Sequence, residues 1–312
     1  MPAIQNLVEH IVDYAGLFPP AALDLTEVIE NYAGYSRGGF SWMLGRLIVP
    51  ASRLSEFSSL AAEHLPKTLA DGWMISALLP PADPGSDTMQ VGLEAIVNFN
   101  QRHQDAANGL ASVDTIEIKA STAEQVSLVD ELLPDGLTAF IELPHADDPT
   151  PLLTLVAHSR KRLFGKIRTG GVTRDLIPPA NQVARFIRSC VKHHVGFKAT
   201  AGLHHPLRGK FPLTYEEKAE RGMMYGFLNV FAAACFAYGT DASQSDLVEI
   251  LKESDPTAFE FSDLSLSWKN LDVTTQRISE IRMRNAISFG SCSFQEPTAE
   301  LSNLGLLANV RA

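Results

Sequence analysis

The chain has 312 residues, of which 45% are apolar and 20% charged, so its composition is that of a globular protein and excludes a disordered chain. The formal net charge is −10 without a Lys- or Arg-rich run, which argues against a nucleic-acid partner. The cysteines, Cys190, Cys235 and Cys292, are widely spaced and form no C-x-x-C motif, as is usual in a reducing compartment. No secretory signal is evident at the N-terminus, so we expect a cytoplasmic protein with one domain over 1–312.

Short apolar runs alternate with amphipathic stretches along the chain. The predicted strands are Ile11–Leu17, Leu44–Val49, Trp73–Leu79, Val113–Ile118, Leu137–Leu143, Leu163–Arg168 and Val195–Thr200. The predicted helices between them are Leu25–Tyr35, Ala51–His64, Met89–His103, Ala123–Leu132, Pro151–Ser159 and Asn181–His193. This alternation predicts a parallel sheet that closes into an α/β fold, the (β/α)8 TIM barrel. The alternative, an open doubly wound sheet, lacks a Gly-rich fingerprint after its first strand.

Two segments compete for the eighth strand. They are Ala258–Phe261 and Ala286–Phe289. The later one is preferred because a helical pattern, Thr274–Arg284, precedes it and another, Thr298–Leu307, follows it. The region at about 205–285 then becomes an insertion that enlarges the seventh βα unit.

The stretch Gly222–Thr240 carries no charge and is just long enough to cross a membrane. Asn229 and internal glycines interrupt it, and nothing else in the chain resembles a membrane segment. We therefore expect no membrane partner, and a helix over Met223–Tyr238 that is buried or faces another copy in a possible homo-oligomer.

Charged residues lie within two neighbouring predicted strands. Successive side chains of a barrel strand alternate between the interior and the surrounding helices. In the sixth strand the apolar Ile167 faces the helices, so Lys166 and Arg168 face the interior. The same rule turns Lys198 and Thr200 inward from the seventh strand.

Carboxylates face these lysines from other strands. Glu117 and Glu142 point inward by the same alternation, and Asp13 on the first strand is expected to do so. Burying a lone charge costs several kcal/mol, so such groups persist only when they are paired or used. Their place late in each strand matches the end of the barrel where enzymes of this fold build active sites.

This arrangement favours Schiff-base chemistry at Lys166. A lysine is nucleophilic only when neutral, and burial beside a second cation, Lys198, is expected to lower its pKa. Glu117 can then transfer protons during the reaction. The alternative is structural: Lys166–Glu142 and Lys198–Glu117 are ion pairs that only fill the barrel.

The strands also resemble the deoxyribose-phosphate aldolase type of class I aldolase, in order along the chain. Asp114-Thr115-Ile116-Glu117 resembles the family's D-E-[VI]-D strand, Lys166-Ile167-Arg168-Thr169-Gly170 its K-T-S-T-G, and Gly196-Phe197-Lys198-Ala199-Thr200-Ala201-Gly202-Leu203 its G-[VF]-K-A-[AS]-G-G-[IV]. Val12-Asp13-Tyr14-Ala15-Gly16-Leu17-Phe18-Pro19, Ile141-Glu142 and Phe289-Gly290-Ser291-Cys292-Ser293 resemble I-D-H-T-L-L-K-P, I-L-E-T and F-G-[AT]-S-S. The resemblance implies that Lys166 forms the Schiff base, Lys198 is the neighbouring cation and Glu117 the acid/base, with Asp13 as the first-strand acid.

The same resemblance extends to the binding of substrate. The substrate-binding candidates are Glu142, Arg168, Thr169, Thr200, His204 and His205, and the anion-binding candidates are Gly170, Gly171, Gly202, Gly290, Ser291 and Ser293. The family's phosphate pocket looks eroded, because Phe18 replaces a lysine, Ala201-Gly202 replaces a glycine pair, and no lysine follows Gly171.

Three functions therefore remain open. The first is a class I lyase that acts on a small-molecule carbonyl substrate and needs no cofactor or metal. The second is a metal-dependent barrel hydrolase or isomerase with Glu142, His145, His204 and His205 as ligands. The third is a barrel that has lost its chemistry and binds a metabolite or partner.

Overall fold

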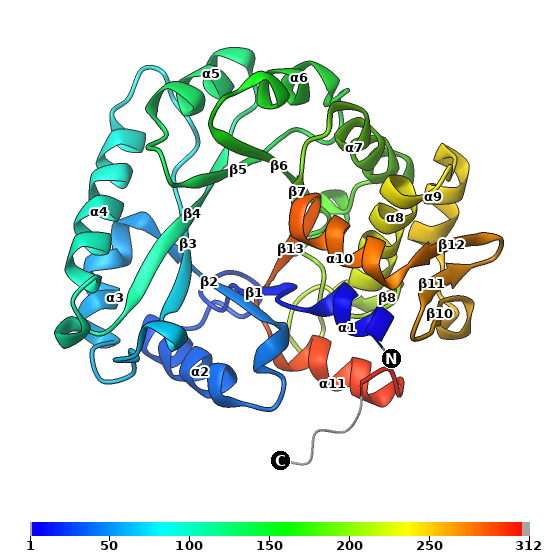
Figure 1. Ribbon diagram of the computed structural model, residues 1–312, viewed down its shortest axis with the longest axis horizontal. Coiled ribbons are helices and arrows are strands. Elements are labelled where there is room, and N and C mark those ends of the chain that lie inside the picture. The colour runs from blue at the N-terminus through cyan, green and yellow to red at the C-terminus, as the bar shows by residue number, and fades with distance from the viewer. Residues whose placement is uncertain (1, 308–312) are drawn as a thin grey trace.

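The computed structural model describes residues 2–307, and its main sheet is a closed parallel barrel (Figure 1). The order around the barrel is β1, β13, β7, β6, β5, β4, β3, β2. The bounds are β1 Val12–Tyr14, β2 Leu44–Pro50, β3 Trp73–Leu78, β4 Ala111–Lys119, β5 Thr138–Glu142, β6 Arg162–Arg168, β7 Phe197–Thr200 and β13 Ala286–Ser291. The predicted TIM barrel is thus confirmed.

Helices surround the barrel because their apolar faces cover the outward side chains of the strands (Figure 1). Their bounds are α1 Pro2–Val8, α2 Leu25–Arg37, α3 Leu54–Leu60, α4 Thr88–His103, α5 Ala123–Leu132, α6 Thr150–His158, α7 Ala180–His193, α8 Phe227–Gly239, α9 Gln244–Lys252, α10 Thr275–Arg284 and α11 Gln295–Asn303. Single turns of 3₁₀ helix occur at 41–43, 51–53, 69–71, 106–108, 174–176 and 256–258.

The eighth barrel strand is β13, as preferred from the sequence, and Phe289 pairs with Val12 and with Ala199 of its two neighbours. The competing segment Ala258–Phe261 contributes only β10, Glu260–Phe261, to a small antiparallel sheet with β11, Ser265–Trp268, and β12, Leu271–Thr274. This sheet lies outside the barrel, beside α8, α9 and α10 (Figure 1).

Several predicted boundaries were wrong. The first strand covers only Val12–Tyr14 of the predicted 11–17, and the chain then turns into the loop that carries Phe18. The helix predicted over 51–64 begins as a 3₁₀ turn and ends at Leu60. The last helix, Gln295–Asn303, begins and ends earlier than the predicted 298–307.

The apolar stretch at 222–240 forms two elements. Its first residues belong to β9, Arg221–Met224, which pairs antiparallel with β8, Gly209–Pro212, and α8 begins only at Phe227. The predicted start of the helix at Met223 was therefore wrong. Nearly every residue of α8 is buried, since it packs between the barrel and the helices α7, α9 and α10. Among residues 2–307, no helix combines the length and the apolar character that crossing a membrane requires.

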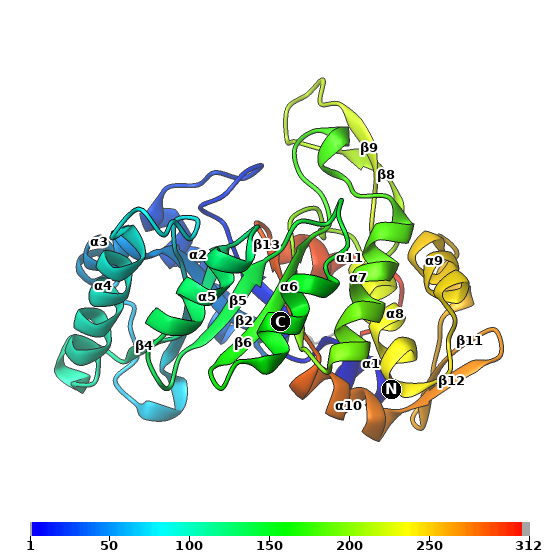
Figure 2. The same ribbon diagram turned by 90° about the horizontal axis from the view of Figure 1, so that it is seen from above.

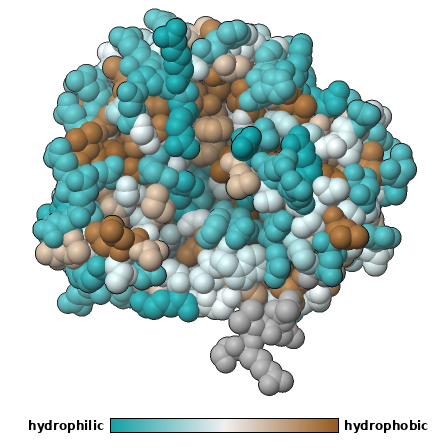
Figure 3. All heavy atoms as spheres, viewed as in Figure 1, coloured by the Kyte–Doolittle hydropathy of each residue, from teal (hydrophilic) through white to brown (hydrophobic). Residues whose placement is uncertain are grey.

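The β8–β9 hairpin rises above the end of the barrel where the strands finish (Figure 2). Leu213, just after β8, and Met224 on β9 line a cavity together with residues at the ends of β5, β6 and β7. Figure 3 shows the opposite end of the barrel, where hydrophilic side chains predominate and apolar ones are interspersed among them. The hairpin thus makes the two ends different, and only the strand-end face carries this cover.

Candidate active site

The two interior lysines lie side by side on β6 and β7, where Lys166 and Lys198 are partners in the strand register. Both ammonium groups are buried, but only Lys166 lines the cavity at the barrel mouth. Lys198 lies deeper, with Nζ 5.8 Å from the centre of the Phe140 ring. The alternation rule placed both side chains inward, and the register determines that they are adjacent.

Glu117 on β4 links the two lysines. One of its oxygens lies 2.9 Å from Lys166 Nζ and the other 2.5 Å from Lys198 Nζ. Ser76 on β3 donates a hydrogen bond of 2.8 Å to the oxygen that also contacts Lys198. This carboxylate is therefore completely partnered although it is buried.

Asp13 on β1 is the second counter-ion of Lys198, at 2.5 Å. Its other oxygen accepts a hydrogen bond from the backbone N–H of Arg46, and Ser288 donates to the oxygen facing Lys198. Gly45 is required beside it, because a Cβ atom there would lie 2.2 Å from Asp13 Oδ1. Asp13 thus lies in a closed environment below the cavity and does not line it.

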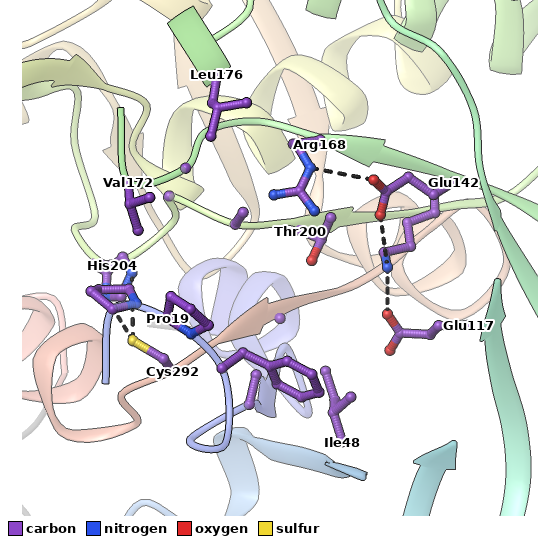
Figure 4. A pocket seen from close by; sticks show the side chains of 18 of the residues that line it. Pro19, Ile48, Glu117, Glu142, Arg168, Val172, Leu176, Thr200, His204 and Cys292 are labelled. Carbon is purple, nitrogen blue, oxygen red and sulfur yellow. Dashed lines mark hydrogen bonds and ion pairs between the residues drawn. The ribbon is translucent and has the colours of Figure 1, made fainter. Parts of the chain in front are cut away.

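Glu142 at the end of β5 extends the pairing to the cavity mouth. Its carboxylate contacts Lys166 Nζ at 3.0 Å through one oxygen and Arg168 Nε at 3.3 Å through the other (Figure 4). The series Asp13, Lys198, Glu117, Lys166, Glu142, Arg168 consequently alternates in sign. With three carboxylates and three cations, its formal charge is zero.

The electrostatics of Lys166 differ from the expectation. Burial alone lowers the pKa of Lys166, but the carboxylates of Glu117 and Glu142 outweigh burial and hold this pKa above its ordinary value. The predicted lowering of the Lys166 pKa by Lys198 was therefore wrong, because Glu117 lies between the two cations. Burial raises the pKa of Glu117, yet Lys166 and Lys198 together hold it far below its usual range.

The pKa of Glu142 is also lowered. Burial opposes this shift, and Lys166 and Arg168 cause it. Unlike Glu117, which two buried ammonium groups contact, Glu142 has one buried cation and one partly exposed partner. Both carboxylates that contact Lys166 therefore stay ionised more readily than an ordinary glutamate.

The cavity above Lys166 has a volume of about 320 Å³. Charged and polar groups lie at its base, including Glu117, Glu142, Lys166, Arg168 and Thr200. Its walls are mainly apolar and are formed by Phe18, Pro19, Pro20, Ile48, Leu78, Val172, Leu176, Leu213 and Met224. Sequence reasoning missed most of this wall, because the loop after β1 and the hairpin approach the mouth only in the folded chain.

The predicted binding residues divide into two groups. Glu142, Arg168, Thr200, His204, Gly171, Gly202 and Gly290 line the cavity, whereas Thr169, His205, Gly170, Ser291 and Ser293 do not. Thr169 is buried and donates to the carbonyl of Ala201, which joins the loops after β6 and β7. Ser291 accepts a hydrogen bond from the backbone of Ser293, and Ser293 accepts one from that of Glu296 at the start of α11.

Gly170 and Gly202 bring the loops after β6 and β7 into contact. A Cβ atom on either glycine would lie 2.9 Å from the Cα atom of the other, and Gly202 has a φ of +75°. The packing of the two loops therefore explains why both positions are glycine, so the glycines by themselves are no evidence of an anion-binding site.

His204 belongs to a small polar cluster on the side of the cavity away from Glu142 (Figure 4). Its Nδ1 lies 2.8 Å from Glu296 Oε2, and its Nε2 lies 3.9 Å from Cys292 Sγ. Tyr215 in the loop between β8 and β9 donates to the same Glu296 oxygen. Burial alone lowers the pKa of His204, but Cys292 and Glu296 outweigh burial and raise it to about 9.

The four candidate metal ligands do not converge. Glu142 is paired with Lys166 and Arg168, whereas His145 contacts Gln182. His204 contacts Glu296, and His205 contacts Glu300. Over residues 2–307, no group of three or more His, Cys, Asp or Glu side chains has an arrangement suited to a metal ion.

The chain was also compared with known proteins. No model of a known protein family matches the chain, and no curated protein matches it as a relative. The functional proposal accordingly depends on the geometry of the barrel and its cavity.

Proposed function

We propose that this chain is a class I aldolase-like lyase in which Lys166 forms a Schiff base with a small carbonyl compound. The observation that carries the proposal is the position of Lys166. It is a buried lysine at the base of a substrate-sized cavity, at the strand-end face of a TIM barrel. It lies between two carboxylates, of which Glu142 can exchange a proton with it and Glu117 can stabilise a positive charge. The second lysine, Lys198, is sealed below it and pairs with Asp13 and Glu117.

The resting ammonium must first lose a proton. Glu142 is the better proton acceptor. Two buried cations hold Glu117 as a carboxylate, whereas Glu142 contacts one buried cation, Lys166, and the partly exposed Arg168. A carbonyl compound that displaces water from the cavity weakens the solvation of both charges, which favours the neutral Lys166–Glu142 pair.

The neutral amine then attacks the carbonyl carbon. A C–N bond forms, the carbonyl oxygen takes up a proton, and loss of water after a second proton transfer gives the iminium ion. In the cleavage direction, the hydroxyl group on the β-carbon, two bonds from the iminium carbon, loses its proton as the bond between the α-carbon and the β-carbon breaks. The electron pair of that bond moves into the iminium group to give an enamine, which is then protonated on carbon and hydrolysed. Glu117 stays ionised beside the iminium nitrogen and stabilises its charge.

Borohydride trapping tests this proposal. The protein is incubated with a panel of small aldehydes, ketones and oxo acids, reduced, and analysed by intact-mass and peptide mass spectrometry. We expect a carbonyl-dependent adduct on Lys166 that is absent from Lys166→Met. Lys161→Met is the control: it removes a lysine that pairs with Asp135 at the surface, and it should form the adduct as fully as the wild type. An adduct confined to other lysines would exclude this mechanism.

A binding barrel without chemistry is the second candidate function. The observation that favours it is the raised pKa of Lys166, since a stable ammonium between two carboxylates is also what a structural ion-pair network requires. The panel distinguishes the two functions, because a ligand of a purely binding barrel raises thermal stability without forming an adduct.

A further inference from the structure

Arg168 lies beside the proposed Schiff-base lysine and shares the carboxylate of Glu142 with it. Its Nε contacts Glu142, and within residues 2–307 its two terminal nitrogens have no hydrogen-bond partner. Figure 4 shows these nitrogens on the side of the guanidinium group that faces away from Glu142, towards the interior of the cavity near Thr200. A guanidinium group with two free donors matches the two oxygens of a carboxylate.

The spacing between Arg168 and Lys166 limits where a ligand's carboxylate can lie relative to its carbonyl group. Both nitrogens contact the same carboxylate, Lys166 Nζ at 3.0 Å and Arg168 Nε at 3.3 Å from the two oxygens of Glu142. The two cations are therefore no farther apart than one carboxylate group together with the hydrogen-bonding contact on each side of it. A 2-oxo acid has its carbonyl and carboxylate carbons directly bonded, so it can present both groups to these two cations at once.

The rest of the cavity selects for an apolar remainder. Phe18, Ile48, Leu78, Leu176, Leu213 and Met224 face the space above the charged base. Apart from Lys166 and Arg168, the cationic group on the cavity wall is His204, which is already paired with Glu296. Glu296 would repel a second anionic group of the ligand. At about 320 Å³ the cavity is at the small end of the range for ligand sites.

We propose that the substrate is a short 2-oxo acid with an apolar side chain, whose carboxylate is bound by Arg168 while its oxo carbon reacts with Lys166. This inference rests on the proposed Schiff-base function and adds the substrate class to it. The apolar walls enclose the remainder of the molecule. Phosphorylated sugars are poor substrates because their phosphate lies several carbons from the carbonyl group, where the cavity wall is apolar and His204 is already paired with Glu296.

The test compares four probes in the trapping assay: pyruvate, 4-methyl-2-oxopentanoate, butanal and deoxyribose 5-phosphate. For the wild-type protein we expect the 2-oxo acids to give the adduct on Lys166 at the lowest concentrations. In Arg168→Gln the half-saturating concentration of both 2-oxo acids should rise about tenfold or more relative to that of butanal, the range expected for losing a charged hydrogen bond. Butanal has no carboxylate, so this ratio cancels any effect that the substitution has on Glu142. Arg277→Gln, which removes a surface arginine paired with Glu280 on α10, serves as the matched control and should not change this ratio.

The outcomes separate the carboxylate site from the Schiff base. If the wild-type protein traps butanal or deoxyribose 5-phosphate at lower concentrations than the 2-oxo acids, the proposed substrate class is wrong. It is also wrong if Arg168→Gln changes the half-saturating concentrations of all probes by the same factor. If no carbonyl compound gives an adduct, the Schiff-base function fails. Calorimetric titration with pyruvate then tests the carboxylate site by itself. If pyruvate binds the wild-type protein but not Arg168→Gln, Arg168 binds the carboxylate; if the two proteins behave alike, it does not.

Discussion

Lys198 has the contacts of a structural counter-ion. It is fully buried between Asp13 and Glu117, and it makes no contact with the cavity. Its removal takes away the cation that Asp13 contacts and leaves Glu117 with Lys166 alone, so two carboxylates lie buried near each other with less compensation. Such uncompensated charge typically destabilises a protein by about 3–5 kcal/mol.

We therefore predict that Lys198→Met lowers the free energy of unfolding by about 3–5 kcal/mol, measured by urea denaturation at pH 7. Lys161→Met removes a lysine whose partner, Asp135, is exposed, and it should cost about 1 kcal/mol or less. Adding Asp13→Asn to Lys198→Met should recover part of the lost stability, since it removes one of the two negative charges that repel each other. Equal stabilities of Lys198→Met and Lys161→Met would contradict this account of the network.

For single residues, the alternation of side chains along the strands predicted which charged residues face the barrel interior. It did not predict their partners. The structural alternative paired Glu117 with Lys198 alone, yet Glu117 contacts both lysines, because partner choice depends on strand register and side-chain reach. The hydroxyl groups of Ser76 and Ser288 complete the network and were missed. Their only signal was a small polar residue at an inward position of a buried strand.

At the scale of elements, the pair of His204 and Glu296 joins the loop after β7 to α11. Cys292 and Tyr215 are the other titratable groups of this cluster. The pKa of His204, raised from 6.5 to about 9, means that the folded protein binds this proton more tightly than the unfolded chain. The stabilisation is therefore complete below pH 6.5 and is lost as the pH rises through about 9.

We predict that the wild-type protein loses on the order of 3 kcal/mol more stability than His204→Gln between pH 6 and pH 10, because one pKa unit corresponds to about 1.4 kcal/mol. Urea denaturation of both proteins across this range measures the difference. Glu296→Gln should reduce the dependence on pH by a smaller amount, because Cys292 also raises the pKa of His204. Parallel stability curves for wild type and His204→Gln would show that the histidine is not charged in the folded state.

Asn229 connects α8 to its neighbours. Its side-chain oxygen accepts from the backbone N–H of Arg208, and its amide group donates to the carbonyls of Ile250 and Glu253. Asn229→Ala leaves buried backbone groups without partners, so we predict a loss of about 2–4 kcal/mol in thermal or urea unfolding. Asn98→Ala, at an exposed position of α4, is the matched control and should stay within about 0.5 kcal/mol.

The elements that could be predicted are those with a strong periodic pattern. The strands and helices from β2 to β7 lie close to their expected positions, and β13 was preferred correctly. Within the insertion expected at about 205–285, only the helices over Met223–Tyr238 and Thr274–Arg284 were predicted. The strands β8 to β12 were missed, because they are two to four residues long and too short for a period to emerge. The hairpin's role in covering the cavity depends on contacts between segments far apart in the sequence.

For the whole molecule, the barrel and the hairpin together determine what the site accepts. The barrel supplies a charge network whose formal sum is zero, which makes its burial tolerable. The hairpin and the loop after β1 add apolar walls that exclude water from Lys166. A ligand that fills this space contacts segments from most of the chain, so its binding should stabilise the entire fold.

This coupling allows binding to be separated from chemistry. We predict that a 2-oxo acid at about 100 times its dissociation constant stabilises the wild-type protein by about 2.7 kcal/mol in thermal unfolding, before any reduction with borohydride. Lys166→Met keeps Arg168 and the apolar walls, so it should retain a measurable part of this stabilisation while forming no adduct. Stabilisation of both proteins with no adduct in either would identify a binding barrel. Stabilisation and adduct in the wild type, with stabilisation alone in Lys166→Met, is the result that a Schiff-base enzyme requires.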